Sequence, residues 1–165
     1  MRFLKISIAT ATLFSAGAVF AQAPAPPPAP LPYGPALSLT DARACAGAVQ
    51  AEAVKNQWLM VVAVVDSGGH SVLTERMDNA QFGSVVPAQK KATGAVAFRR
   101  PTKFFEDLIA QGGAALRILT LPGVLPIDGG LPIIRDGHII GGVGVSGGTS
   151  QQDGLAAAAC QSMIK

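Results

Sequence analysis

The stretch GGLPIIRDGHIIGGVGVSGGTSQQD, residues 129–153, decides how this chain folds. Asp136-Gly137 separates two apolar segments, and this dipeptide favours a type I′ hairpin turn, in which both central residues need positive φ. The second segment is rich in glycine, at 141, 142 and 144 and again at 147 and 148. Glycine inside a strand marks a bulge or a close approach by a ligand or another backbone. The sequence therefore predicts a central hairpin in close contact with another part of the molecule.

A helix is expected directly after this hairpin. Thr149 or Ser150 can cap it, and Gln152 or Asp153 lies three residues further on, as in a capping box. The backbone N–H groups of such a helix N-terminus favour anions. However, the glycine pattern matches neither a dinucleotide fingerprint nor a P-loop. Close packing of the hairpin under a helix is therefore the simpler explanation of the glycines, and an anion site is the other.

The N-terminus has the pattern of a secretory signal peptide. Arg2 and Lys5 precede an apolar run over 6–20, and small residues favour cleavage after Ala21, with Ala23 as the alternative. We expect residues 1–21 to be removed and the protein to be periplasmic or secreted. Without the two basic residues of the peptide, eleven basic residues face ten acidic ones, a net charge of +1. This balance gives no reason to expect nucleic acid as a partner.

Residues 22–37 read as a linker, and residues 38–165 as a single domain. The linker begins QAPAPPPAPLPYGP, a Pro/Ala composition typical of an extended, semi-rigid spacer that contributes nothing to a core. About 130 residues follow it, enough for one domain with a hydrophobic core.

Hydrophobic periodicity predicts an α+β fold for that domain. Apolar residues recur every three or four positions in the first helix, and WLMVVAVV (58–65) is typical of a strand buried on both faces. The expected order is a helix to residue 56, strands at 58–65 and 70–77, helices at 85–98 and 103–110, the hairpin, and a helix at 150–164. Hairpins imply a mainly antiparallel sheet covered by helices.

Three segments resemble one known family. They are VVDSGGHSVLTERMDNA (64–80), QKKATGAVAFRRPT (89–102) and PIDGGLPIIRDGHIIGGVGVSGGTSQQD (126–153), of which the last is the most specific. Together they resemble the GlcG/HbpS-like haem-binding family, which includes the C-terminal domain of PduO-type proteins. The resemblance covers nearly the whole chain after residue 38.

The resemblance implies a fold, a ligand and partners. The family fold is a profilin-like sandwich, a five-stranded antiparallel sheet with helices on both faces. Known members are oligomeric, some bind haem, and one is the extracellular partner of a sensor kinase. We therefore expect a secreted small-molecule binder for haem or a related tetrapyrrole, acting in storage, sensing or scavenging, as a homo-oligomer and with a membrane sensor among its candidate partners. An enzyme or accessory protein of hydroxy-acid or diol metabolism and a ligand-free signalling oligomer are the alternatives.

His70 and His138 are the candidate iron ligands, because a haem iron accepts neutral imidazole. Each follows a turn that begins a strand, so an exposed histidine beside a turn is the simpler explanation. Met60 and Met77 are weaker candidates, since core packing is the commoner role of methionine. Tyr33 could reach an iron only if the linker folded back.

Haem propionates need cations, and the resemblance favours Arg76 and Lys91 for this role because the family motifs recur around them. A solvated helix face explains Lys91 equally well. Gly129 and Gly130, in the most specific segment, complete the expected ligand site.

Cys45 and Cys160 are the two cysteines of the chain. In an oxidising compartment such a pair indicates a disulfide first, with two buried free thiols as the alternative. If the first and last helices pack antiparallel, as the profilin-like arrangement suggests, the alanine-rich surroundings of both cysteines allow a bridge.

A nucleophile–base–acid set is not evident in the sequence. Gly144-Val145-Ser146-Gly147-Gly148 has the letters of a nucleophile elbow, but an elbow needs a helix directly after the serine. We therefore expect a binding protein rather than a serine hydrolase.

Overall fold

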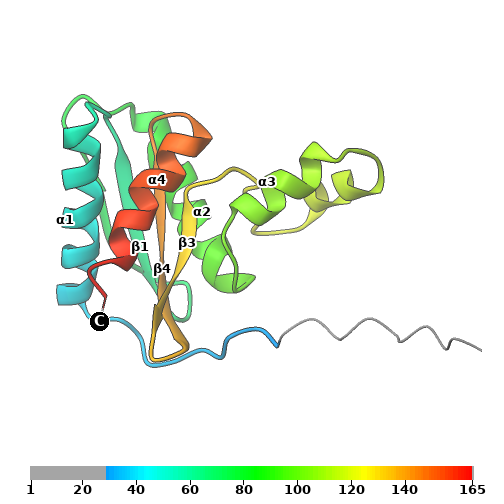
Figure 1. The fold of residues 1–165 in the computed structure, drawn as a ribbon, viewed down its shortest axis with the longest axis horizontal. Helices are drawn as coiled ribbons and strands as arrows, with labels where there is room; N and C mark the ends of the chain where they lie inside the picture. The colour runs from blue at the N-terminus through cyan, green and yellow to red at the C-terminus, as the bar shows by residue number, and fades with distance from the viewer. Residues whose placement is uncertain (1–28, 165) are drawn as a thin grey trace, which may run out of the picture.

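The computed structural model describes residues 29–164, which form an α+β sandwich (Figure 1). The sheet has the strand order β2-β1-β4-β3, and all its neighbouring strands are antiparallel. Its strands are β1 (Val61–Asp66), β2 (Ser71–Arg76), β3 (Gly130–Arg135) and β4 (His138–Ser146). The helices are α1 (Leu39–Lys55), α2 (Val85–Ala97), α3 (Lys103–Ala110) and α4 (Ser150–Gln161), with 3-10 segments η1 (Phe82–Ser84) and η2 (Gly113–Thr120). The predicted signal peptide, residues 1–21, lies outside the described residues.

The number of strands corrects one expectation. The family resemblance implied five strands, whereas the sheet over residues 29–164 has four. Between α3 and β3 the chain forms η2 and then runs without regular structure to β3. Pro122 and Pro126 in this stretch lack the N–H groups that a strand ladder uses. The α+β class and the antiparallel sheet are confirmed.

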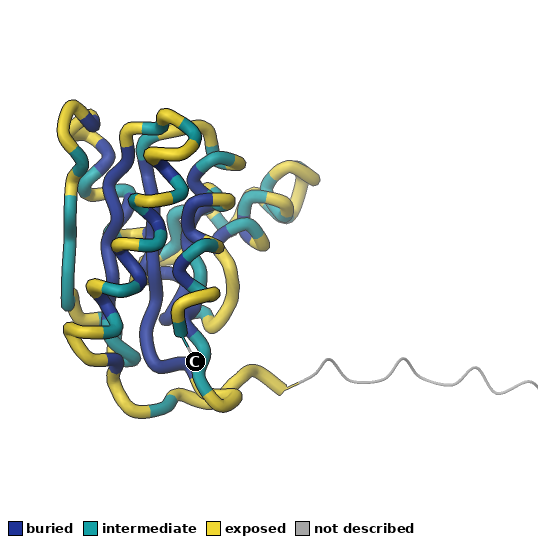
Figure 2. The backbone as a smooth tube through the Cα atoms, turned by 60° about the vertical axis from the view of Figure 1, so that its left-hand side comes forward, coloured by how far each residue is buried: buried dark blue, intermediate teal, exposed yellow. Residues whose placement is uncertain are grey.

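Helices cover both faces of the sheet. Val62 and Val64 of β1 belong to the core under α1 and α4, and Val61, Ala63 and Val65 belong to the core under α2. This alternation explains why the whole run of β1 is apolar, because each of its faces meets a helix. Figure 2 shows the buried backbone concentrated in the central strands.

The central hairpin has the predicted turn and the predicted close approach. Asp136 and Gly137 have φ angles of 50° and 74°, as a type I′ turn requires. A Cβ on Gly144 would lie 2.5 Å from the backbone nitrogen of Ala92 and closer still to the carbonyl oxygen of Ala88. The glycines of β4 therefore let the backbone of α2 approach the sheet. Thr149 caps α4 in a capping box with Gln152.

The segment expected to be a linker reaches the sandwich. Gly34 N donates to the carbonyl of Ile139 at 2.9 Å, and Ile139 N donates to the carbonyl of Pro32 at 2.9 Å. Leu37 is only 5% exposed and belongs to the core under α1 and α4. The core thus begins at Leu37, directly after the Pro/Ala-rich stretch 22–35 that was expected to contribute nothing to it. Residues 22–28 are outside the described part.

A disulfide joins Cys45 of α1 to Cys160 of α4, and the two Cα atoms are 4.3 Å apart. The helices pack side by side on the same face of the sheet, as the profilin-like arrangement suggested (Figure 1). The cysteines are fully buried and bonded, so the alternative of two free thiols is wrong.

Residues 103–127, called the arm below, stand out from the sandwich (Figure 1). The arm contains α3 and η2, which pack mainly on each other. Within α3 and η2, Phe105 is the one buried residue, whereas Leu119 is 61% exposed. Across residues 29–164, none of the helices has the length and apolar character needed to cross a bilayer.

Candidate functional site

The candidate site residues fall into two groups at opposite ends of the sheet. β1 and β4 are antiparallel, with Asp66 opposite Gly141, so the β1–β2 turn and the β3–β4 turn lie at the same end. This end, called the hairpin end below, carries His70 and His138. Arg76 pairs with Val61 at the other end of β1. A six-residue strand spans roughly 17 Å, which is about the separation of the two groups along the sheet.

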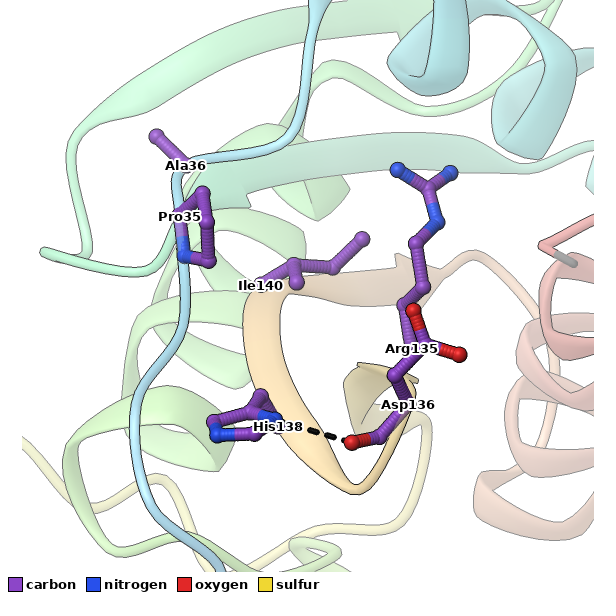
Figure 3. Close-up of a pocket in the computed structure, with 6 residues that line it drawn as sticks. All are labelled: Pro35, Ala36, Arg135, Asp136, His138 and Ile140. Atoms are coloured by element: carbon purple, nitrogen blue, oxygen red, sulfur yellow. Dashed lines mark hydrogen bonds between the residues drawn. The ribbon is translucent and has the colours of Figure 1, made fainter.

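A small pocket of about 200 Å³ opens at the hairpin end (Figure 3). Its lining comes from the β3–β4 hairpin and from the segment before α1: Pro35, Ala36, Arg135, Asp136, His138 and Ile140. The segment lies directly on the hairpin, since a Cβ on Gly34 would be 2.8 Å from the Cβ of His138. Pro35 and Ala36, in the segment expected to be a linker, therefore form one wall of the pocket.

The imidazole of His138 is oriented by its own turn. Its Nδ1 lies 2.8 Å from the carbonyl oxygen of Asp136, a contact drawn in Figure 3. With the proton on Nδ1, the ring donates to this carbonyl and Nε2 carries a lone pair. Histidines that ligate metals usually donate their other N–H to a carbonyl or carboxylate in this way. The side chain is exposed, so a ligand can reach it.

Arg135 connects the pocket to α1. Its Nη2 donates to Oδ1 of Asp41 at 2.9 Å, and Nη1 donates to Oδ2 at 3.4 Å. These hydrogen bonds, together with that from Ser38, hold the pKa of the Asp41 carboxyl below its usual value. Figure 3 shows the guanidinium directed away from His138. The pair therefore braces the hairpin against α1.

His70 occupies the neighbouring turn and is also exposed. Its Nδ1 is 3.3 Å from Oδ1 of Asp66, and its side chain is 82% exposed. Burial alone would raise the pKa of the Asp66 carboxyl, but backbone N–H donors at His70 and Gly68 outweigh it and lower the pKa. Both histidines are thus exposed residues beside turns, as the simpler explanation held, and the fold brings them to one end of the sheet.

The cations at the opposite end already have partners. Arg76 Nη1 donates to the carbonyl of Ala80 at 2.6 Å. Lys91 is 1% exposed, and its Nζ donates to Oδ2 of Asp153 at 2.6 Å and to the carbonyl of Val145 at 2.9 Å. The alternative that Lys91 lies on a solvated helix face is therefore wrong, because α2 turns this side chain into the core.

Gly129 and Gly130 make backbone contacts beside Lys91. Val145 N donates to the carbonyl of Gly129 at 2.8 Å, and Gly130 N donates to the hydroxyl of Thr102 at 2.9 Å. Gly129 has a φ of 113°, and a Cβ there would come within 3.0 Å of the Lys91 ammonium. Glycine is required at this position by both the backbone and the packing.

Sequence reasoning missed a group of carboxylates around Lys91. Asp153, considered only as a capping residue, is the partner of Lys91, and Gly148 N also donates to it at 3.0 Å. Glu106 accepts hydrogen bonds from Asp128 N at 2.7 Å and from Ser150 Oγ at 3.3 Å. Burial raises the pKa of the Asp128 carboxyl. No periodicity signals this group, because its members come from segments far apart in the chain.

The nucleophile elbow weighed from the sequence finds no support in the geometry. Gly147, Gly148 and Thr149 separate Ser146 from α4, so the serine does not sit in a nucleophile elbow. Within residues 29–164, no three or more His, Cys, Asp or Glu side chains are grouped to hold a metal ion.

Comparisons with known proteins agree with the fold. The family model described as haem degrading protein HbpS-like matches residues 37–161. Protein GlcG of Escherichia coli K12 is 41% identical over 110 residues, which cover 67% of this chain and 81% of that protein.

Two solved structures are similar over most of their length. The crystal structure of a PduOC:haem complex has a TM-score of 0.71 and 35% identity, covering 79% of this chain and 96% of that one. A double mutant of HbpS from Streptomyces reticuli has a TM-score of 0.73 and 32% identity, covering 87% and 99%. The sequence motifs, the sandwich and these matches together place the chain in the HbpS-like family.

Proposed function

We propose that this protein is a secreted or periplasmic small-molecule-binding protein that takes up haem or a related tetrapyrrole at its hairpin end. The observation that carries the proposal is the orientation of His138, whose Nδ1 faces the carbonyl of Asp136 and whose Nε2 is directed away from that bond. Membership of the HbpS-like family and the similarity to PduOC, which was solved with haem, support the choice of ligand.

The residues at the hairpin end fit the chemistry of this ligand. A haem iron needs one or two axial ligands, because the porphyrin supplies the others, and a neutral imidazole is a common one. Pro35 and Ile140 offer apolar surface beside His138. The pocket of about 200 Å³ is smaller than the roughly 300 Å³ or more of sites that enclose a ligand. We therefore propose that haem is held by one part of its macrocycle, with the remainder covered by a second copy of the chain.

The compartment and partners belong to the same proposal. The predicted signal peptide supports export, and the Cys45–Cys160 disulfide is typical of proteins in oxidising compartments. A homo-oligomer and a membrane sensor partner follow from the family resemblance and complete the proposed role in storage, sensing or scavenging.

Titration of the purified mature chain with haemin tests this function. We expect a Soret band for the wild type and a loss of affinity of about tenfold or more in His138→Ala, since loss of an iron ligand removes more than about 1.4 kcal/mol. His70→Ala tests the other imidazole at the same end, and Arg76→Ala probes the opposite end. Unchanged spectra and affinity in all three variants would reject the site, and a missing Soret band in the wild type would reject haem as the ligand.

A further inference from the structure

A second cavity, of about 340 Å³, runs along the outer edge of β3. β3 is an edge strand of the sheet, so this side of it faces solvent. Apolar side chains supply much of the lining: Leu31, Leu131, Pro132 and Ile134. Arg99 and Arg100 also line it. The groove, as this cavity is called below, thus combines an apolar lining with two adjacent positive charges.

Aromatic rings hold both guanidiniums in place. The Arg99 guanidinium lies 4.3 Å from the centre of the Tyr33 ring, and that of Arg100 lies 4.4 Å from the centre of the Phe104 ring. Tyr33 is itself fixed, because its hydroxyl donates to the carbonyl of Val96 at 2.8 Å. Stacking of this kind orders an arginine while leaving N–H groups at its edge available.

Neither guanidinium is neutralised within residues 29–164. Arg99 donates to the carbonyl of Leu31 at 3.4 Å, and Arg100 donates through Nε to the carbonyl of Phe98 at 3.1 Å. The ion pairs of this part of the chain involve other side chains. The groove therefore presents two ordered, uncompensated cations.

The backbone at the end of α2 fixes the position of Arg99. α2 ends in a Schellman motif, in which Arg100 N donates to Ala95 O and Arg99 N donates to Val96 O, both at 3.1 Å. Arg99 occupies the left-handed position of this motif with a φ of 53°, where glycine would be free of strain. Gln57 occupies the same position at the end of α1, with a φ of 59°, so the motif fixes where the Arg99 side chain starts and does not by itself indicate a function.

We propose that the groove binds a single-chain anionic amphiphile, with its hydrocarbon chain along β3 and its head group on Arg99 and Arg100. Arginine forks bind carboxylates and phosphates in two-point hydrogen bonds, so either head group meets this chemistry. None of the eight residues that line the groove is a histidine, methionine, cysteine or tyrosine. The site therefore offers no usual iron ligand and is separate from the hairpin-end pocket.

Calorimetric titration of the mature chain with decanoate, decyl phosphate and decanol, each below its micelle concentration, tests the proposal. We expect at least one of the two anions to bind, and decanol to bind about tenfold more weakly, because a charge-assisted hydrogen bond contributes roughly that factor. Binding of decanoate alone identifies a carboxylate ligand, and binding of decyl phosphate alone identifies a phosphate ligand.

Variants connect the binding to the groove. Arg99→Gln and Arg100→Gln should each weaken binding of the anion about tenfold. Arg43→Gln, which removes an exposed charge from α1, should leave it unchanged, as should His138→Ala at the proposed haem site. Failure of both anions to bind, equal binding of decanol, or equal affinities in all the variants would overturn the proposal, whatever the outcome of the haemin titration.

Discussion

At the scale of single residues, the Lys91–Asp153 pair is an ion pair whose two side chains are both buried. Lys91 is 1% exposed and Asp153 is 3% exposed, and they join α2 to the first turn of α4. Burial raises the pKa of the Asp153 carboxyl, and the hydrogen bond from Lys91 opposes this rise. We expect Lys91→Met to lower the free energy of unfolding by about 3–5 kcal/mol, because the remaining carboxylate is buried without its partner. Urea denaturation measures the change.

Two further variants test whether the loss of stability comes from the unpaired Asp153 carboxylate. Lys90→Met removes the exposed neighbouring charge, and it should change the free energy of unfolding by less than about 0.5 kcal/mol. The double variant Lys91→Met with Asp153→Leu should recover much of the loss, since both charges are gone. If Lys91→Met kept full stability and weakened haemin binding instead, Lys91 would be a ligand residue rather than a structural one.

At the scale of elements, the contact between α2 and β4 depends on the absence of a side chain at Gly144. A Cβ there would overlap the carbonyl of Ala88, and backbone on both sides cannot give way as a flexible side chain would. Gly144→Ala should therefore lower the free energy of unfolding by about 1–3 kcal/mol, the usual effect of overpacking. Gly47→Ala is the matched control. It adds the same methyl group in α1, where nothing lies within 4 Å, and it should stabilise by about 0.5–1 kcal/mol. Equal effects of the two substitutions would contradict this account.

The features that could be predicted from the sequence are those that depend on residues close together in the chain. The turn at Asp136-Gly137 and the cap at Thr149 follow from neighbouring residues, and both are confirmed. The burial of Lys91 has no local signal, because its partner lies 62 residues away. Likewise, the meeting of His70 and His138 at one end depends on the pairing of β1 with β4, which periodicity does not specify. The sequence therefore offers candidate residues for a site, but it does not show how the fold arranges them.

At the scale of the whole molecule, the Cys45–Cys160 disulfide closes most of the domain into one loop. The two residues are 115 positions apart, and the chain-entropy model gives such a loop about 4–5 kcal/mol as an upper value. We expect the variant with both cysteines changed to serine to lose about 2–5 kcal/mol of unfolding free energy. Mass spectrometry of the unreduced, alkylated protein gives the direct check, and two alkylated thiols in the folded chain would contradict the bridge.

The arm carries exposed apolar side chains that could form an interface between copies of the chain. Only 14% of the residues are charged while 49% are hydrophobic, so apolar side chains must cover part of the surface. On the arm, Phe104, Leu116 and Leu119 are 42%, 47% and 61% exposed, in elements that pack mainly on each other. Apolar surface of this kind is commonly covered by a partner. We expect the mature chain to form a symmetric oligomer through the arm, and light scattering at micromolar concentration measures its mass.

A surface variant distinguishes the arm from other exposed apolar residues. Leu119→Asp places a charge on the arm, and it should reduce the mass toward that of one chain without loss of helix in circular dichroism. Val54→Asp is the control, because Val54 is 64% exposed on α1, away from the arm. It should leave the mass unchanged. A wild-type mass equal to that of one chain would contradict the predicted oligomer, and a reduced mass in Val54→Asp alone would place the interface on α1 instead.

The hairpin-end pocket is too small to enclose a haem. The same mass measurement repeated with haemin would therefore show whether oligomer formation and haem binding are coupled.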